Sequence, residues 1–337
     1  MEKLIKIKRA LISVSDKTGI VELAKELYGR KIELVSTGGS ASILRDAGFK
    51  VTEVSKLTGF PEMMDGRLKT LHPNVHGGLL ADRDEKSHVN AMEKYNVKEI
   101  DLLVVNLYPF AETVRAGADY AQCIENIDIG GPAMIRAAAK NFKYVATLVD
   151  IEDYEGLVNE LKMNNGCTSY SFRQKLSQNA FSLSAYYDAM VSNWMLDNIT
   201  GVKPRRFSIS AALSQDLRYG ENPHQSASFF LDEYLQGGIG ASNQIQGKKL
   251  SYNNINDTDA ALELVNEFPQ NDGAAAVIVK HANPCGVGVA NSLVEAYRSA
   301  FSCDKTSAFG GIVALNRIID EESAREIIKV FTEVVIA

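Results

Sequence analysis

A continuous apolar run at residues 100–106 (IDLLVVN) constrains the fold of this chain more than any other feature. A strand that is apolar on both sides is typical of a parallel sheet covered by helices on both faces. Residues 144–149 (YVATLV) form a second such run. Helical periodicity lies between the strand-like segments, and in residues 18–28 one helical face carries Ile20, Leu23, Ala24 and Leu27. This alternation predicts an α/β fold with a mainly parallel sheet.

The rest of the chain follows the same pattern and divides into two domains. Further strands are expected at residues 8–14, 32–36 and 50–54, and helices at 41–47 and 170–198. The turn-forming segment Thr200-Gly201-Val202-Lys203-Pro204 follows the long helix and marks a boundary. Beyond it, strands are expected at 273–279 and 311–315 and helices at 292–301 and 321–331. The prediction is a first domain over 1–199 and a second over 200–337.

The sequence ends at Val334–Ala337, which we expect to be a core strand. Domains rarely end inside an apolar strand without a polar tail. We therefore expect these residues to be part of a longer protein.

Composition excludes several classes of protein. With 337 residues, 45% hydrophobic and 23% charged, the chain is neither disordered nor collagen-like nor a coiled coil. Its formal net charge of -6 makes it a poor candidate for nucleic-acid binding, so an anionic substrate needs a local group of cations. The first residues lack the apolar core and cleavage site of a signal peptide, so we expect none, and no apolar run reaches the ~20 residues that a membrane span needs. Its four cysteines form no C-x-x-C, and we expect reduced thiols in a cytoplasmic protein.

Two segments that join a strand to a helix could bind an anion. Residues 13–19 (SVSDKTG) offer hydroxyls and a lysine at a helix N-terminus, where free N–H groups and the helix dipole favour negative charge. Residues 36–40 (STGGS) add two glycines that permit close approach of the backbone to a ligand. Either segment alone could be only a helix cap or a tight turn. Two at the carboxyl ends of neighbouring strands favour a phosphate site.

Two further segments of the first domain carry candidate catalytic groups. Residues 65–73 (DGRLKTLHP) place Arg67 and Lys69 on one side of an extended chain. His72 and His76 have metal-ligand spacing, but Pro73 argues against a helix there, and we expect no metal. In residues 125–132 (ENIDIGGP), Asp128 precedes a Gly-Gly-Pro turn at a helix start. Lys140 follows on that helix, and spacing alone does not decide whether it reaches the same site.

The second domain contains three polar segments: 217–225 (LRYGENPHQ), 280–286 (KHANPCG) and 307–311 (SAFGG). A lysine and a histidine at the end of a core strand lie where α/β enzymes place catalytic groups. Residues 286–291 (GVGVAN) lack the third glycine of a dinucleotide fingerprint, and no P-loop motif occurs. Pro284-Cys285 is similar to the start of the zinc-deaminase motif P-C-x-x-C, but residue 288 is Gly, so zinc is not expected. We expect Cys285 to be a small buried thiol.

Taken together, eight ordered motifs between residues 13 and 316 resemble one family, the bifunctional purine-biosynthesis proteins that join IMP cyclohydrolase to AICAR formyltransferase. The motifs are SVSDKTG, STGG, DGRLKTLHP, NLYPF, ENIDIGGPAMIRAAAKN, LRYGENPHQ, KHANPCG and SAFGGIVALN. The resemblance covers the N-terminal part of the family. It implies a methylglyoxal-synthase-like first domain and the first part of a cytidine-deaminase-like formyltransferase domain without zinc.

The resemblance also implies residue roles. In the first domain the nucleotide 5′-phosphate would lie on Ser13, Ser15, Lys17, Ser36, Thr37, Gly38, Gly39, Arg67 and Thr70. The base and the reacting formamide of FAICAR would be surrounded by Lys69, Asn106, Tyr108, Asp128, Gly130 and Lys140. We expect Asp128 to orient the attacking carboxamide, Lys69 and Tyr108 to stabilise oxyanion charge, and Lys140 to donate a proton.

For formyl transfer from the co-substrate 10-formyltetrahydrofolate to AICAR, the resemblance implies a site at a homodimer interface. AICAR would be bound by Arg218 and Tyr219, with Asn256 and Gly310 nearby. His281 would remove a proton from the AICAR amine, and Lys280 would stabilise the developing charge. The expected partners are AICAR, FAICAR and IMP, with neither nucleic acid nor membrane. The alternatives on the same first-domain fold are a phosphate-sensing regulatory module and methylglyoxal synthase, and neither requires NLYPF, IDIGGPA or the second domain.

Overall fold

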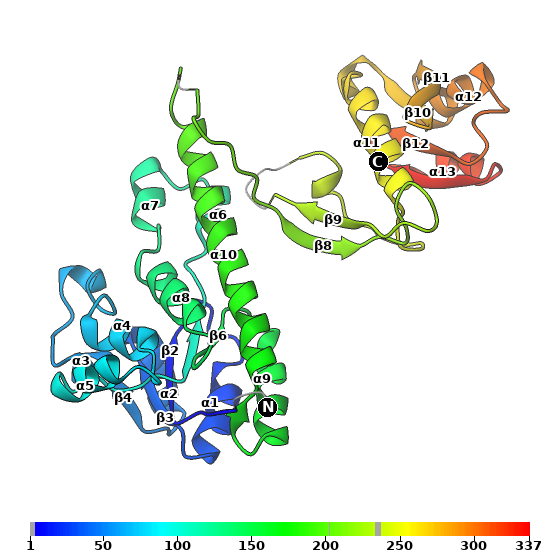
Figure 1. Cartoon of the computed structure of the whole chain (residues 1–337). Coiled ribbons are helices and arrows are strands. Elements are labelled where there is room, and N and C mark those ends of the chain that lie inside the picture. The colour runs from blue at the N-terminus through cyan, green and yellow to red at the C-terminus, as the bar shows by residue number, and fades with distance from the viewer. Residues whose placement is uncertain (1–3, 202, 233–236) are drawn as a thin grey trace. The chain divides into compact units, whose positions relative to one another are not determined.

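The computed structural model describes residues 4–201, 203–232 and 237–337 and divides the chain into two compact units (Figure 1). Unit 1 comprises residues 1–210 and unit 2 residues 211–337. The long helix predicted for the end of the first domain is α10, Tyr170–Asp197. Val202, in the predicted boundary segment, lies outside the described residues. A domain boundary at residues 199 and 200 stays a prediction.

Unit 1 is built on a parallel sheet, as the apolar runs predict. Its strand order is β4-β3-β2-β5-β6, and every neighbouring pair is parallel. The strands are β2 Arg9–Ser13, β3 Glu33–Ser36, β4 Val51–Glu53, β5 Leu102–Val105 and β6 Ala146–Leu148. A separate antiparallel pair joins β1, Ile5–Lys6, to β7, Cys167–Thr168. The chain builds the sheet outward from β2 on one side and then returns to add β5 on the other, so the strand order reverses between β2 and β5.

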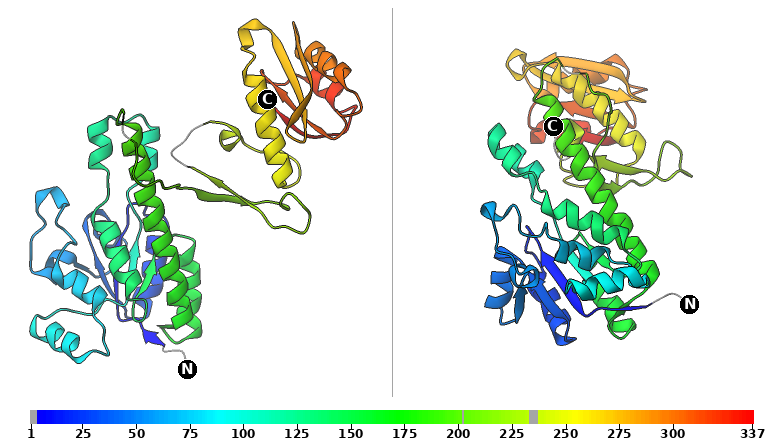
Figure 2. Two further views of the ribbon diagram at one scale, coloured as in Figure 1. Left: turned by 45° about the horizontal axis from the view of Figure 1, so that its top comes forward. Right: turned by 60° about the vertical axis from the view of Figure 1, so that its left-hand side comes forward.

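Helices cover both faces of this sheet (Figure 2). Unit 1 contains the helices α1 Ile20–Gly29, α2 Gly38–Asp46, α3 Val54–Thr58, α4 Pro73–Leu80, α5 Lys86–Lys94, α6 Phe110–Arg115, α7 Tyr120–Glu125, α8 Gly130–Lys140 and α9 Asp153–Met163, and a 3-10 turn at Met64–Gly66, in addition to α10. One core contains side chains of α1, α2 and α9, and the other contains side chains of α4 and α8. The residues that α1 buries are the four predicted from its periodicity.

Two local predictions in unit 1 were wrong. Pro73 does not prevent a helix, because it is the first residue of α4, where the missing N–H has no intrahelical partner in any case. His72 caps this helix by accepting the N–H of Asn74 at its Nδ1, and His76 lies inside the helix. Helix α2 begins at Gly38, earlier than the predicted Ala41.

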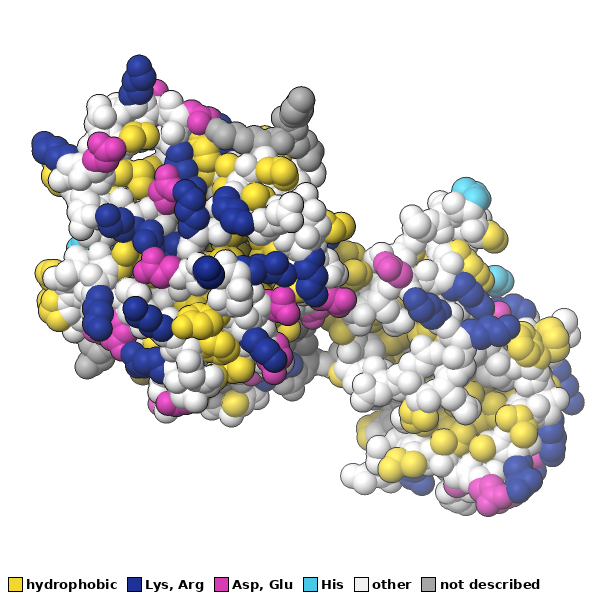
Figure 3. Space-filling view, turned by 90° about the horizontal axis from the view of Figure 1, so that it is seen from below, with side chains coloured by type: hydrophobic (Ala, Val, Ile, Leu, Met, Phe, Trp, Pro, Cys, Tyr) yellow, Lys and Arg dark blue, Asp and Glu magenta, His cyan; other side chains and the backbone are white. Residues whose placement is uncertain are grey.

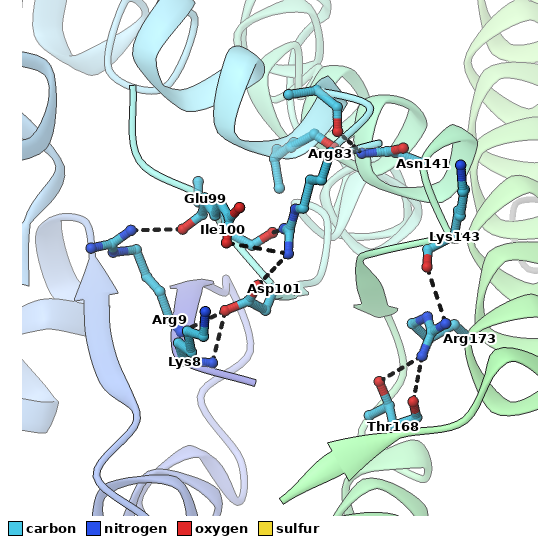
Figure 4. A network of polar contacts seen from close by, with 12 residues as sticks. Lys8, Arg9, Arg83, Glu99, Ile100, Asp101, Asn141, Lys143, Thr168 and Arg173 are labelled. Atoms are coloured by element: carbon cyan, nitrogen blue, oxygen red, sulfur yellow. Dashed lines mark hydrogen bonds and ion pairs between the residues drawn. The ribbon is translucent and has the colours of Figure 1, made fainter. Parts of the chain in front are cut away.

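At the amino ends of the strands, two buried charges join the layers of unit 1 (Figure 4). The carboxylate of Asp101, 1% exposed, accepts the backbone N–H groups of Lys8 and Arg9 and an ion pair from Arg83 at 2.6 Å. Arg173, fully buried on α10, donates to the carbonyl oxygens of Phe142, Lys143 and Thr168. A buried charge is tolerated only when it is paired or hydrogen-bonded in this way, so this end of the sheet has a structural role.

Unit 2 has a mainly antiparallel sheet of order β11-β10-β12-β13, in which only β12 and β13 run parallel. Its strands are β8 Ala212–Asp216, β9 Ser228–Leu231, β10 Ala274–Lys280, β11 Asn283–Ala290, β12 Gly311–Leu315 and β13 Thr332–Ile336, of which β8 and β9 form a separate hairpin. Its helices are α11 Tyr252–Asn266, α12 Leu293–Cys303 and α13 Glu321–Ile327, with 3-10 turns at Ile239–Ala241 and Gln270–Asp272. Helix α11 packs on one face of the larger sheet and α12 on the other.

Strand β11 was not predicted, because Pro284 and its two glycines disfavour strands. A Cβ on Gly286 or Gly288 would lie 2.0 or 2.1 Å from a carbonyl oxygen of α12, so these glycines let the helix lie directly on the strand. The predicted core strand at the end of the sequence is instead the edge strand β13, with Val335 41% exposed. Helix α13 ends at Ile327, short of the predicted 331, because a turn leads into β13 there.

Charge is mixed on the surface. On the face shown in Figure 3, basic side chains are spread over unit 1 with acidic ones among them. No helix within the described residues is long and apolar enough to cross a membrane. The described part of the chain also contains no group of three His, Cys, Asp or Glu side chains placed to hold a metal. The four cysteines are free.

Candidate functional site

The two predicted anion-binding segments of unit 1 lie side by side at the carboxyl ends of β2 and β3. The hydroxyl oxygens of Ser13 and Thr37 are 3.1 Å apart. The ammonium of Lys17 donates to the carbonyl of its own loop residue Ser15 at 2.7 Å, and its Cε would lie 3.4 Å from a Cβ on Gly39. The structure therefore brings the SDK and STGG segments into one cradle of hydroxyl, ammonium and helix N-terminal groups.

The glycines of the second segment make room for a cation. Gly38 has φ 43°, and a Cβ there would lie 2.8 Å from the Nζ of Lys69. Glycine is favoured at this position because its φ lies in the left-handed region, and a Cβ would also require the ammonium of Lys69 to move. Ser36 is placed differently: its buried hydroxyl donates to the carbonyl of Ile12 at 2.7 Å, so it joins β3 to β2. Its predicted role on phosphate stays a prediction.

Both predicted cations of the DGRLKTLHP segment are paired with carboxylates. Lys69 lies 3.1 Å from Glu62, and Arg67 is paired with Glu125 at the end of α7. A small cleft at this point is lined by Ser36, Thr37, Gly38, Glu53, Val54, Ser55, Phe60, Glu62 and Lys69. An anionic ligand that binds to either cation must compete with these carboxylates. Glu62 could not be identified from the sequence, because no motif or periodic pattern marks it as a partner of Lys69.

Asn106, directly after β5, lies at the point where the strand order reverses. Its side-chain oxygen accepts the N–H groups of Ser15 and Asp16, and its amide donates to the carbonyl of Asp16 at 2.9 Å. Ligands in open α/β sheets bind outside the carboxyl ends of strands at such a reversal. Asn106 thus holds the SDK loop in place, and its predicted contact with the base stays a prediction.

Asp128 is a half-buried carboxylate at the start of α8. Burial raises its pKa, and hydrogen bonds from the backbone of Gly131, Tyr108 and Gly130 act in the opposite direction. The bond from Gly131 to Oδ1 is 2.8 Å long. A Cβ on Gly131 would lie 2.7 Å from the other carboxylate oxygen, so glycine is needed for this contact. A fixed carboxylate with a raised pKa is suited to accept a hydrogen bond or a proton from a reacting group.

Tyr187 supports Asp128 from α10 and was not identified from the sequence. Its buried hydroxyl accepts the N–H of Asp128 at 2.8 Å. Burial raises the pKa of Tyr187 to about 12, so the hydroxyl stays protonated at neutral pH. Tyr187 belongs to a long helix whose pattern indicates only packing, and nothing local in the sequence connects it to Asp128.

Thr70 joins the cradle to the Asp128 turn. It follows Lys69 directly, and its Oγ1 lies 3.0 Å from where a Cβ on Gly130 would be. Tyr108 contributes its backbone to Asp128, while its side chain is 51% exposed. The structure therefore groups the predicted phosphate-binding and catalytic segments of unit 1 around β2, β3, β5 and the start of α8.

Lys140 lies away from the predicted site residues at the start of α8. Helix α8 is continuous from Gly130 to Lys140. At 1.5 Å per residue, its length separates Lys140 from the Asp128 turn by about 15 Å. The role of Lys140 as proton donor stays a prediction that the geometry of this chain does not support.

Unit 2 collects its own predicted residues around the start of α11 and the tip of β10. The guanidinium of Arg218 lies 4.9 Å from the ring centre of Tyr219, and the carbonyl of Tyr219 accepts the N–H of Tyr252 at the start of α11. Asn256 is exposed one turn further along this helix. The predicted AICAR-binding residues Arg218, Tyr219 and Asn256 thus belong to adjoining segments.

The predicted catalytic pair lies at the β10–β11 turn. The ammonium of Lys280 donates to the carbonyl of Phe309 at 2.7 Å, next to Gly310. The N–H of His281 donates to the carboxylate of Asp257, the neighbour of Asn256 on α11. Hydrogen bonds therefore connect the pair to Phe309, the neighbour of Gly310, on one side and to Asp257, the neighbour of Asn256, on the other. Asp257 was not identified from the sequence.

Cys285 follows this turn on β11 and is partly buried. Burial raises the pKa of its thiol, with the nearby Asp304 acting in the same direction. A raised pKa disfavours the thiolate, so the geometry does not indicate a nucleophile here.

The fold and the two groups of polar residues define a two-unit α/β protein whose first unit groups the candidate anion-binding segments. Comparison with protein-family models agrees: residues 19–133 match an MGS-like domain, and residues 138–337 match the AICARFT/IMPCHase bienzyme. The second match extends over more than half of the chain. The chain belongs to the AICARFT/IMPCHase bienzyme family, and the family predicted from its motifs is confirmed.

Several similar proteins are named bifunctional purine biosynthesis protein PurH. The one from Dinoroseobacter shibae is 61% identical over all 337 residues, and the one from Ruegeria pomeroyi is 60% identical over the same length. The chain spans 64% of the length of each. The crystal structure of ForH matches 56% of the chain at 35% identity, with a TM-score of 0.49 and 99% of that structure covered.

Proposed function

We propose that unit 1 closes FAICAR to IMP and that unit 2 carries the catalytic pair for formyl transfer to AICAR, the last two steps of IMP formation in purine biosynthesis. Support comes from family membership and from the names of the relatives. The observation that carries the ring-closure proposal is the fixed Asp128 carboxylate next to the anion cradle, joined to it through Thr70 and Gly130.

In the proposed binding mode, the phosphate of FAICAR occupies the cradle of Ser13, Lys17 and Thr37 with the N–H groups at the start of α2. The phosphate of FAICAR competes with Glu125 for Arg67. The reacting formamide group of FAICAR competes with Glu62 for Lys69. The Arg67–Glu125 pair is largely exposed and the Lys69–Glu62 pair partly exposed, and exposed pairs contribute little stability, typically about 0–1 kcal/mol. A doubly charged phosphate can therefore displace them.

Ring closure joins the carboxamide nitrogen of FAICAR to its formyl carbon. The formyl oxygen becomes an alkoxide, accepts two protons in turn and leaves as water, while the attacking carboxamide nitrogen and the formamide nitrogen each lose one proton. Asp128 accepts a hydrogen bond from the attacking carboxamide, and Lys69 with the Tyr108 hydroxyl stabilises the oxyanion. The step needs no oxidant or reductant.

In formyl transfer the AICAR amine attacks the formyl carbon of 10-formyltetrahydrofolate, and the folate nitrogen leaves. His281 accepts the amine proton, and Lys280 stabilises or protonates the developing charge. Arg218 and Tyr219 bind AICAR, with Asn256 and Gly310 nearby. The folate is a co-substrate, and we propose that its site also needs the part of the relatives that this sequence does not span, at the interface of a cytoplasmic homodimer.

The test is to assay both reactions with the 337-residue chain. IMP formation from FAICAR, followed by absorbance, should be observed. Formyl transfer should fall below detection, since losing the groups that orient a substrate removes up to about 7–11 kcal/mol of proximity contribution. A folded chain that does not close FAICAR would contradict the proposal for unit 1.

A further inference from the structure

The turn between β10 and β11 has an unusual backbone at both of its central residues. His281 has φ 54° and Ala282 has φ 56°, while Lys280 and Asn283 pair across the base of the turn. A two-residue hairpin loop with positive φ at both positions normally contains Asn and Gly, because a Cβ is disfavoured in the left-handed region. Histidine occurs in the left-handed region more often than most residues, but alanine does not, so Ala282 is the disfavoured residue of the turn. Something outside the turn must therefore hold it.

Asp257 of α11 supplies that support. Its Oδ2 accepts the N–H of His281 at 3.2 Å, and its Oδ1 accepts the N–H of Ala282 at 2.8 Å. Successive N–H groups in a turn of this kind point to the same side and form a concave site for negative charge. One carboxylate therefore satisfies both donors, in the conformation that the turn adopts.

Helix α11 holds this carboxylate firmly with respect to the sheet. Ala261 and Val265 of the helix are fully buried against the face of the sheet that contains Val277 and Val279. Asp257 lies one turn before Ala261 on the same helix, and it is partly buried. By contrast His281 and Ala282 are exposed. The carboxylate of Asp257 thus holds the exposed turn in a fixed position relative to the packed helix.

The other groups at the turn depend on the same conformation. The side chain of Asn283 donates to the carbonyl of His281 at 2.6 Å, and Lys280 donates to Phe309. If the turn relaxed to negative φ at its centre, the peptide groups on both sides of His281 would rotate. The orientation of the imidazole relative to Lys280 and Asn256 would then change.

We propose that Asp257 is a positioning residue for formyl transfer, which holds His281 in a strained turn so that its imidazole meets the amine of the substrate. This inference rests on the proposed role of His281. Asp257 itself touches no reacting atom in this account, since both of its oxygens are taken by the turn.

The kinetic test uses the chain extended by the C-terminal part of the Dinoroseobacter shibae relative, so that both activities can be measured. Asp257→Ala should lower kcat for formyl transfer roughly 10-fold to 100-fold, the range expected when a catalytic group is misplaced by about 1 Å. The KM for AICAR should change by less than about twofold, because the substrate-binding groups stay in place. Ring closure by the same preparation should be unchanged. Asp259→Ala, which removes an exposed carboxylate from the same helix, is the matched control and should leave both activities unchanged.

A second substitution separates positioning from a general structural role. Glycine adopts positive φ without strain, so Ala282→Gly should restore most of kcat in the Asp257→Ala background. Asp257→Asn should lose part of the activity, since its single oxygen faces two donors. Failure of Ala282→Gly to restore any activity would contradict the positioning role, as would an unchanged kcat in folded Asp257→Ala.

An exchange measurement on the 337-residue chain tests the contact without any assay. In Asp257→Ala, hydrogen exchange should become faster at the amides of His281 and Ala282, while Ala261 and Val277 keep their protection. Unchanged exchange at both turn amides would overturn the inference.

The two proposals fail in different ways. If His281→Ala leaves formyl transfer intact, the proposed function fails and the positioning role with it. If His281→Ala abolishes transfer and Asp257→Ala does not lower kcat, only the positioning role is wrong.

Discussion

The two units hold their proposed catalytic groups by different means. In unit 1 the groups follow parallel strands and a helix start, and backbone N–H groups fix Asp128. In unit 2 the pair lies at the tip of an antiparallel hairpin, where His281 has positive φ and a carboxylate from a neighbouring helix supports the turn. A parallel sheet brings several loops to one edge through topology alone. A hairpin tip offers no such convergence, so its groups need support from another element.

If the hairpin tip is the formyl-transfer site alone, its loss should not affect unit 1. In the extended chain, His281→Ala should lower formyl transfer by about 10²–10⁴-fold, the usual contribution of a general base. Ring closure should be unchanged. Both activities are measured on one preparation of the variant. A fall in ring closure with the fold intact would show that the two sites are not separate.

Within unit 1, the reacting end and the phosphate cradle should respond differently to loss of a lysine. Lys69→Ala should lower kcat for ring closure by about 10²–10³-fold, as expected for a group that stabilises an oxyanion. Lys17→Ala should mainly raise KM, by about 10-fold to 100-fold, because a charged hydrogen bond to a remote phosphate contributes about 1.5–3 kcal/mol. Steady-state kinetics of the two variants make the comparison. The reverse pattern would mean that the two roles are exchanged.

The support of Asp128 by α10 predicts a smaller effect. Tyr187→Phe removes the hydroxyl that accepts the N–H of Asp128 and keeps the packing of the ring against Phe110. The loss of one hydrogen bond, about 1 kcal/mol, should lower kcat for ring closure by roughly fivefold to tenfold. The thermal midpoint of unfolding of the variant serves as the control for stability. An unchanged kcat would show that backbone N–H groups alone fix Asp128.

The pKa of Asp128 predicts the pH dependence of unit 1. Burial raises this pKa, and activity needs the ionised carboxylate, so activity is lost as pH falls through the raised value. The acid limb of kcat/KM for ring closure should therefore lie above pH ~4, the ordinary range of an aspartate. A pH–rate profile of the chain measures this limb. A limb at or below the ordinary value would mean that the carboxylate is not the group that titrates.

The sequence predicts those parts of the molecule that depend on local pattern. The buried face of α1 follows from helical periodicity, and the apolar run of β5 requires helices on both faces of the sheet. The SDK and STGG loops converge as predicted, because the carboxyl ends of parallel strands share one edge. Contacts between distant residues could not be predicted. Tyr187 and Asp128, or Asp257 and His281, meet only through packing of helices whose sequences indicate nothing beyond a buried face.

Other errors have local causes. Strand β11 could not be predicted because it contains Pro284 and two glycines, and these residue types disfavour strands unless close packing requires them. Pro73 argues against a helix between His72 and His76 in the sequence, but the first helical position tolerates proline, and α4 begins there. The placement of Lys140 could not be decided from spacing, and it depends on α8 being one uninterrupted helix.

In the proposed function, unit 1 contains a complete ring-closing site that does not need unit 2. The most direct test is the rate of IMP formation from FAICAR by residues 1–210 alone, compared with the 337-residue chain. We expect kcat and KM to agree within about twofold, because the groups assigned to bind and react with FAICAR all precede residue 150 and the supporting residue Tyr187 also precedes residue 210. A 1–210 chain that is folded by circular dichroism but does not form IMP would contradict it.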